Sequence, residues 1–115
     1  YFGMREDVSM FYQLSDYFIL PSRKEGLPNS LIEALACGLT TIISNIPGIS
    51  TFLQDGINGI ILKNNNDKEL SEILIDLTKN CRANDRIQDQ SRDTALKYFN
   101  IKQICKQYID LYTTL

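Results

Sequence analysis

Short apolar runs alternate along the chain with segments whose apolar residues recur at helical spacing. Three runs rich in β-branched or aromatic residues predict strands: Tyr17–Leu20, Thr41–Ser44 and Ile60–Leu62. Pro21 stops the first run, whose continuous apolar character is typical of a strand buried on both faces. Turn signals at Asp55-Gly56 and Asn58-Gly59 precede the third run. Because helical segments separate the strands, the pattern predicts a parallel sheet covered on both faces.

The helical segments carry their own start and stop signals. Asp7 is suited to cap a short helix with apolar residues at Val8, Phe11 and Tyr12. A helix from Asn29 to Cys37 should end at Gly38, since glycine readily adopts the left-handed conformation that terminates helices. Residues 46–53 predict a loop that leads to a short turn or helix.

From Lys63 onward the strand signals cease and the pattern is helical. Asp67 can cap a helix whose apolar stripe is Leu70, Ile73, Leu74 and Leu77. A more polar helix is predicted from about Ala83 to Tyr98. At the start of the last helix, Asn100 with Gln103 resembles a capping box, and Phe99 with Ile104 resembles a hydrophobic staple. The broad apolar face of this helix runs from Ile101 to Leu115.

The predicted fold class is α/β, a Rossmann-like three-layer fragment with a small parallel sheet of three or four strands and a helical C-terminal tail. The parallel α/β part comprises residues 1–62 and the tail residues 63–115. Tyr1-Phe2-Gly3 has the character of the end of a strand whose beginning is missing. We therefore expect the chain to be part of a larger protein.

Composition narrows the function classes. The 115 residues fit one domain, and a hydrophobic share of 43% with 23% charged residues is ordinary for a globular protein. The net charge of -2 gives no field that would attract nucleic acid or anionic lipid. No apolar run approaches the roughly 20 residues that span a bilayer. The amino end lacks the basic start and the apolar stretch of a signal peptide.

Cysteine and histidine usage excludes several chemistries. Cys37, Cys81 and Cys105 stand far apart with no CxxC pair, and the chain has no histidine. A zinc site and a disulfide framework are therefore not expected, and neither is a Ser-His or Cys-His nucleophile. We interpret the three cysteines as buried small hydrophobic residues in a reducing cytosol.

The segment after the first predicted strand carries the candidate chemistry. Glu33 is the only charge in the run Leu31-Ile-Glu-Ala-Leu-Ala-Cys37, and a carboxylate held against apolar surface is costly unless something hydrogen-bonds it. Gly26 allows close backbone approach to a ligand, and the helix start at Asn29 suits an anion such as a diphosphate. In an open parallel sheet, ligands bind beyond the carboxyl ends of the strands, where these residues lie. A site that binds phosphate in its middle and accepts hydrogen bonds from sugar hydroxyls on both sides fits a nucleotide-sugar.

The pattern Pro21-Ser22-x-x-Glu25-Gly26-Leu27-Pro28-x-x-Leu31-x-Glu33-Ala34-x-Ala36-Cys37-Gly38 resembles the E-x7-E signature of retaining GT-B glycosyltransferases of the group 4 family. Further segments resemble the same family: Asp7-Val8 before Ser15–Leu20, Asn45-Ile-Pro-Gly48, and Asp55-Gly-x-Asn-Gly59. The matching residues run from about Gly3 to Leu62, with a helical tail of the family's type behind them. The resemblance implies that residues 1–115 are part of a GT-B C-terminal, nucleotide-sugar-binding domain.

The resemblance also implies roles for individual residues. It assigns Glu25 to the catalytic centre, where the carboxylate accepts hydrogen bonds from hydroxyls of the donor sugar. The amides near Gly26 and Leu27 contact that sugar. The amides of Asn29 and Ser30 hold the diphosphate, and Glu33 holds the ribose hydroxyls. No metal and no cofactor is implied.

The chain departs from the family's pattern in two places. Thr51 occupies a position where the family often has Glu, so a role for that acid is in doubt. The family's Arg and Lys that neutralise the diphosphate lie before Tyr1, and Arg23 and Lys24 occupy variable places of the motif. We interpret these two residues as a solvated loop tip.

The resemblance implies hexosyl transfer from a nucleoside-diphosphate sugar to a glycan or lipid-linked acceptor, with retention of configuration. A missing N-terminal domain binds the acceptor. By analogy, the full-length protein is cytoplasmic, acts at the inner face of the membrane with peripheral association, and serves capsule or other cell-surface polysaccharide synthesis. We expect the isolated chain to be inactive. The alternatives are a GT-B nucleotide-sugar epimerase and a non-catalytic sugar-nucleotide-binding remnant.

Overall fold

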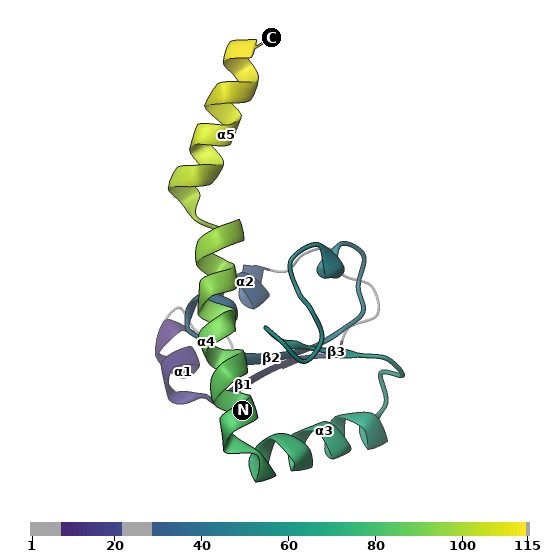
Figure 1. The fold of residues 1–115 in the computed structure, drawn as a ribbon. Coiled ribbons are helices and arrows are strands. Elements are labelled where there is room, and N and C mark those ends of the chain that lie inside the picture. Colours follow the sequence, from purple (N-terminus) through teal and green to yellow (C-terminus); the bar gives the residue numbers. More distant parts are fainter. Residues whose placement is uncertain (1–7, 22–28, 115) are drawn as a thin grey trace.

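The computed structural model describes residues 8–21 and 29–114 (Figure 1). The elements follow in the order α1 (Val8–Leu14), β1 (Tyr17–Leu20), α2 (Asn29–Ala36), β2 (Thr40–Ser44), the 3₁₀ helix η1 (Ile49–Thr51), β3 (Ile60–Leu62), α3 (Asp67–Lys79), α4 (Cys81–Tyr98) and α5 (Ile101–Thr114). The predictions at Tyr1–Gly3, for Asp7 as a cap and for Arg23 to Leu27 lie outside the described residues.

The three strands form one parallel sheet in the order β1-β2-β3. Tyr17 of β1 pairs with Thr40 of β2, and Ile42 of β2 pairs with Ile60 of β3. The described part thus confirms the α/β class, the small parallel sheet and the helical tail. All five residues of β2 are buried because strands pair on both of its sides.

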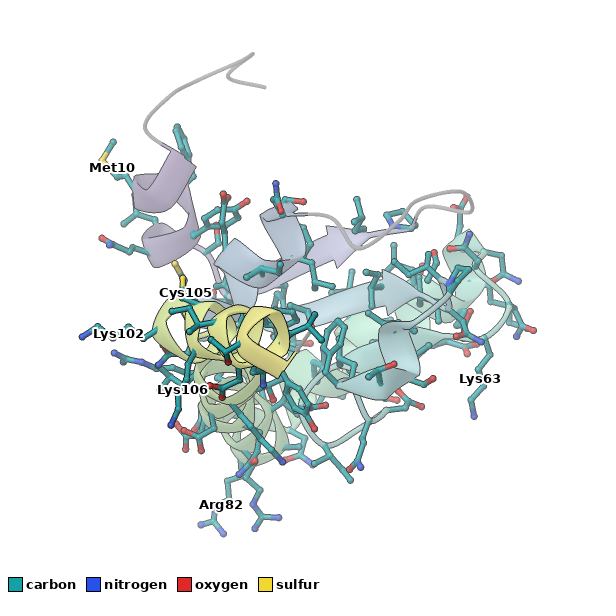
Figure 2. All side chains as sticks on the ribbon, turned by 90° about the horizontal axis from the view of Figure 1, so that it is seen from above. Met10, Lys63, Arg82, Lys102, Cys105 and Lys106 are labelled. Carbon is teal, nitrogen blue, oxygen red and sulfur yellow. The ribbon has the colours of Figure 1, made fainter. Side chains whose placement is uncertain are left out.

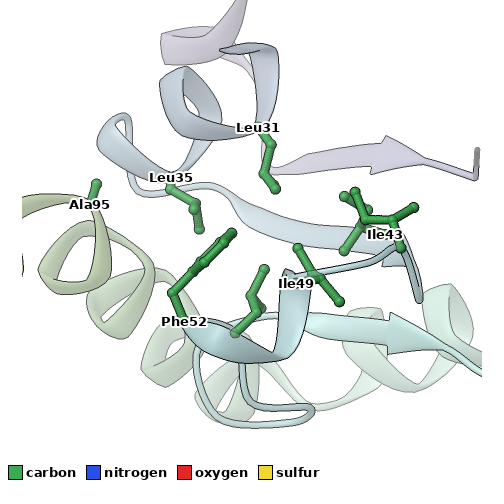
Figure 3. Packing of buried hydrophobic residues seen from close by; sticks show 8 residues of the cluster. Leu31, Leu35, Ile43, Ile49, Phe52 and Ala95 are labelled. Carbon is green, nitrogen blue, oxygen red and sulfur yellow. The ribbon is translucent and has the colours of Figure 1, made fainter. Parts of the chain in front are cut away.

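Helices cover both faces of the sheet, as the alternation of elements predicted. Adjacent residues of a strand point to opposite faces. Ile43 of β2 belongs to a cluster with residues of α2 and the η1 segment, among them Leu31, Leu35, Ile49 and Phe52 (Figure 3). Ile42 belongs to a second cluster, with Leu62, Leu77 of α3 and Ile87 of α4.

The burial expected for β1 is wrong. Ile19 is 38% exposed, and the other three residues of this strand are only partly buried. The physical reason is that β1 pairs with β2 alone among the described residues, so it is an edge strand there. A continuous apolar run indicates a strand, but it does not tell a central strand from an edge strand.

Helix ends follow the sequence signals with one change. Gly38 has a φ of 74°, its N–H donates to Leu35, and the Leu39 N–H donates to Ala34, which together form the Schellman motif that stops α2. The cap of α3 is Asn66 and not Asp67, because the Asn66 side chain accepts the N–H of Glu69.

The turn before β3 is fixed by a buried asparagine. The Asn58 side-chain amide donates to the Phe52 carbonyl and to the Thr94 hydroxyl of α4, each at 2.8 Å, and its oxygen accepts the Gln54 N–H at 2.7 Å. The Ser91 hydroxyl donates to the Asn58 carbonyl at 3.1 Å. The bonds with Thr94 and Ser91 join the loop between β2 and β3 to α4.

The last helix extends away from the sheet (Figure 1). At its start, the Asn100 side chain accepts the Lys102 N–H at 3.0 Å, as expected of a cap, whereas the side chains of Gln103 and Ile104 lie outside the described part. Cys37, Cys81 and Cys105 are all exposed free thiols, so the expectation that they are buried is wrong. No helix among the described residues is long and apolar enough to cross a membrane.

Candidate functional site

The candidate site lies at the carboxyl edge of the sheet, where β1 ends at Leu20 and α2 begins at Asn29. The helix runs back along the sheet towards the start of β2, so its N-terminus stays at that edge. Leu31, Ala34 and Leu35 are completely buried against the sheet and anchor the helix there. Of the predicted site residues, Glu25, Gly26 and Leu27 lie outside the described part.

Asn29 and Ser30 form the first turn of α2, as predicted. Asn29 is exposed and Ser30 is half-buried. The first four N–H groups of a helix have no partner within the helix, and they stand at the positive end of its dipole. The first turn of α2 contains no acidic residue that would compete with an anion. This helix start therefore suits a phosphate group, as the sequence indicated.

Glu33 is exposed, so the expectation of a carboxylate pressed against apolar surface is wrong. The reason is the phase of the helix. Leu31, Ala34 and Leu35 share the buried face, whereas Glu33 lies about 200° around the helix axis from Leu31. The carboxylate therefore projects from α2 into solvent, one turn beyond the first amides. A ligand can reach it without entering the core.

A tyrosine from α1 feels the charge of this carboxylate. Burial, then the charge and hydrogen bond of Glu33, and then Cys37 raise the pKa of Tyr12 above its ordinary value. The tyrosine ring packs edge-on against Phe18 of β1, with centroids 6.2 Å apart. Tyr12 thus joins the candidate site, although sequence reasoning placed it only on the apolar face of a helix.

A second polar cluster lies beyond β2 and β3 and was not predicted. The Glu69 carboxylate accepts three successive backbone N–H groups, from Lys63, Asn64 and Asn65, at 2.7 to 2.8 Å. The Lys63 N–H, followed by those of Asn64 and Asn65 and the Lys63 charge, lowers the pKa of Glu69. The Ser44 hydroxyl donates to the Asn65 side-chain oxygen at 2.7 Å.

This second cluster is satisfied by the chain itself. Its amides already bind a carboxylate, so they are not available to a phosphate in this conformation. Lys63 lies far across the molecule from Met10 of α1 (Figure 2). Within residues 8–21 and 29–114, no three Cys, Asp or Glu side chains gather as metal ligands. The start of α2 therefore remains the candidate for an anion.

Comparison with known proteins adds the family. The model of the family described as glycosyl transferases group 1 matches residues 1–94. An N,N'-diacetylbacillosaminyl-diphospho-undecaprenol alpha-1,3-N-acetylgalactosaminyltransferase of Campylobacter jejuni is 33% identical over 112 residues. A UDP-Gal:alpha-D-GlcNAc-diphosphoundecaprenol alpha-1,3-galactosyltransferase of Escherichia coli is 30% identical over 110 residues. The alignments cover 97% and 96% of this chain, but only 30% and 28% of the relatives.

Solved structures share the fold. The Anabaena protein HepE, crystallised with UDP, superposes with a TM-score of 0.90 at 20% identity, over 96% of this chain and 31% of that one. The C-terminal domain of a group 1 family glycosyl transferase from Francisella tularensis gives a TM-score of 0.77 at 18% identity, over 88% of this chain and 52% of that one. At these identities the likeness concerns the fold alone.

Proposed function

This chain belongs to the group 1 glycosyl transferases, and we propose that the protein containing it transfers a hexose from a nucleoside-diphosphate sugar to a glycan or lipid-linked acceptor. We further propose that it is a member of the retaining group 4 family, so that the product keeps the anomeric configuration of the donor. In this reaction the bond between the anomeric carbon and the diphosphate oxygen breaks. A bond to an acceptor hydroxyl forms, the nucleoside diphosphate leaves with the electron pair, and the acceptor releases a proton.

The observation that carries the proposal is the arrangement on α2. Its first amides, at Asn29 and Ser30, are followed within one turn by the exposed carboxylate of Glu33. A diphosphate at the helix start and a ribose beside the carboxylate fit this order, because amides and the helix dipole favour anions and a carboxylate accepts hydroxyl hydrogen bonds. Glu25 then accepts hydrogen bonds from hydroxyls of the donor sugar, and the amides of Gly26 and Leu27 contact the same sugar.

The domain organisation is part of the proposal. The chain spans about 30% of the length of the curated relatives it matches. We propose that residues 1–115 supply the second half of a C-terminal, donor-binding domain, with residues 1–62 as its α/β part and residues 63–115 as its helical tail. The acceptor then binds to another domain of the full-length protein. The two relatives are named for transfer to sugars linked to undecaprenol diphosphate, which supports a lipid-linked acceptor. We also propose that the full-length protein works at the inner face of the membrane.

The test is a transfer assay on the full-length protein with Glu33→Ala. UDP- and GDP-sugars are offered with polyprenol-diphosphate-linked acceptors, and release of the nucleoside diphosphate is measured together with the glycosylated product. We expect Glu33→Ala to abolish transfer, with the fold unchanged by circular dichroism. Glu72→Ala is the matched control, since Glu72 is an exposed glutamate within α3. Normal turnover and normal donor affinity in Glu33→Ala would refute the assigned role of this residue.

A further inference from the structure

We propose that Asp55 and Glu69 close the outer edge of β3 to strand addition, and that this edge, once uncapped, pairs with the same strand of a second copy of the protein. An open strand edge is a ready template for another chain, and native proteins protect such edges. This role is separate from the proposed glycosyl transfer, because it concerns the side of β3 and not the start of α2.

The directions of the backbone groups follow from the pairing of the strands. The Thr40 N–H donates to the Asp16 carbonyl at 3.2 Å, so Thr40 faces β1. Because successive residues of a strand face alternate sides, Ile43 of the same strand faces β3, where it lies opposite Ile61. In a parallel pair a residue bonds the two neighbours of the residue opposite. Those neighbours therefore face β2, and Ile61 faces outward.

The outward groups at this edge already have partners within the chain. The Ile61 N–H donates to the Asp55 carboxylate at 2.9 Å. Two residues further on, the outward N–H of Lys63 donates to the Glu69 carboxylate at 2.7 Å. Two residues before Ile61, the carbonyl of Gly59 accepts an N–H from its own turn at 2.8 Å. Three successive outward positions are thus occupied, two of them by carboxylates.

The two carboxylates reach the edge from opposite ends of β3. Asp55 lies in the turn before the strand, and Glu69 lies in the first turn of α3 after it. Both bonds are exposed to solvent, so water could satisfy the same N–H groups. A carboxylate differs from water because it is tethered and charged. An added strand has to displace it and to place its own carbonyl oxygens beside a negative charge.

The opposite edge of the sheet is different. By the same alternation, Tyr17 and Ile19 of β1 direct their N–H groups away from β2. Within residues 8–21 and 29–114, no side chain caps these two groups. Ile19 is also 38% exposed, whereas Ile60 and Ile61 of β3 are half-buried. The caps therefore mark β3 as the side on which the sheet ends and leave β1 open to further strands.

A second copy is the partner that fits an uncapped β3, because it carries the same edge. A two-fold axis sets two identical strands antiparallel, with the two Ile61 residues opposite each other. Opposed residues of this kind exchange both of their N–H···O bonds. Ile60 and Ile61 are β-branched, which favours strand pairing. The self-pairing that the carboxylates prevent is therefore isologous.

The experiment is sedimentation velocity of the full-length protein over a series of concentrations. Asp55→Ala, Glu69→Ala and the double variant remove the caps, and thermal unfolding shows whether each variant is folded. We expect the double variant to associate beyond the wild-type state, with a dissociation constant lower by about 10-fold or more. That factor corresponds to about one additional net hydrogen bond.

Two control variants separate the cap from the charge. Asp55→Asn loses the charge but keeps a side-chain oxygen that can accept the Ile61 N–H. Glu72→Ala removes an exposed charge within α3. We expect both to sediment as the wild type does.

The outcomes decide the role of the two carboxylates. Reversible association of the double variant, with wild-type behaviour in both controls, supports the closure of the edge. A folded double variant that keeps the wild-type state at every concentration overturns it. So does association of Asp55→Asn to the same extent as Asp55→Ala, because the charge and not the cap would then be the cause. If the double variant loses its cooperative unfolding transition, the two single variants decide by the same criteria.

Discussion

Replacing Asn58 by alanine should strongly destabilise this domain, because its side chain makes three hydrogen bonds, two within the loop before β3 and one to α4. Asn58 is only 9% exposed. Its amide nitrogen donates to the Phe52 carbonyl and the Thr94 hydroxyl, and its side-chain oxygen accepts the Gln54 N–H, at 2.7 to 2.8 Å. Alanine retains none of these bonds.

The magnitude follows from what each partner loses. Three hydrogen bonds at about 1 kcal/mol each give about 3 kcal/mol. The Thr94 hydroxyl still donates to the Gln90 carbonyl, and Gln54 is exposed, so water can satisfy its N–H. The carbonyl of the buried residue Phe52 can lose its partner, which raises the expected cost to about 3–4 kcal/mol. That is a large part of the roughly 5–15 kcal/mol that stabilises an average domain.

Native-state hydrogen exchange on the full-length protein measures this effect, because the amides of β2 and α4 report the free energy of opening of this domain. Asn58→Ala should lower that free energy by about 3–4 kcal/mol, as worked from the lost hydrogen bonds. Asn45→Ala, at an exposed asparagine in the loop after β2, should change it by less than about 0.5 kcal/mol. A loss below about 1 kcal/mol in Asn58→Ala would refute the reasoning, since each bond would then contribute far less than a typical one.

Two further predictions concern the same core and the second polar cluster. Gly59→Ala should destabilise the domain by about 1–3 kcal/mol, because an added Cβ would stand 2.1 Å from a Leu53 methyl and 2.8 Å from the Thr41 hydroxyl. Thermal unfolding compared with the wild type measures this, and an unchanged unfolding midpoint would show that the surrounding side chains can relax. Glu69→Gln should be less stable than the wild type at neutral pH, and the gap should close as the pH falls. The pKa of Glu69 is lowered in the folded state, so its contribution is present above the unfolded pKa of about 4.3 and is lost as the pH falls through the folded value. Unfolding midpoints between pH 7 and 3, compared with Glu72→Gln, check this, and a gap that is constant with pH would contradict it.

The regular elements could be predicted because their signals are local. The β-branched run at β2, the stripe of α3 and Gly38 at the end of α2 each specify an element within a few residues. Asp67 was predicted as the cap of α3, one residue after the actual cap, because asparagine and aspartate are about equally good caps. The structure selects Asn66, whose position three residues before Glu69 allows both side chains to bind amides.

The contacts between elements could not be predicted in the same way. Asn58 carries a turn signal, and nothing local shows that its amide would reach Thr94 of α4. Tyr12 comes under the influence of the Glu33 charge only because α1 and α2 pack against each other, and a helix-face pattern alone assigns the tyrosine to the core. Glu33 was identified as the site carboxylate from its apolar neighbours, yet the helix turns it to solvent. Glu33 remains the proposed site residue, but its carboxylate does not lie against apolar surface as first expected.

The central claim is that the start of α2 binds the diphosphate of the donor. Hydrogen exchange of the full-length protein, with and without saturating UDP or GDP, tests it directly at the peptide level. The account predicts slower exchange in a peptide covering Asn29 to Glu33, with no change in one covering Lys63 to Glu69, whose amides already bind the Glu69 carboxylate. Nucleotide protection at residues 63–69 with none at residues 29–33 would contradict it.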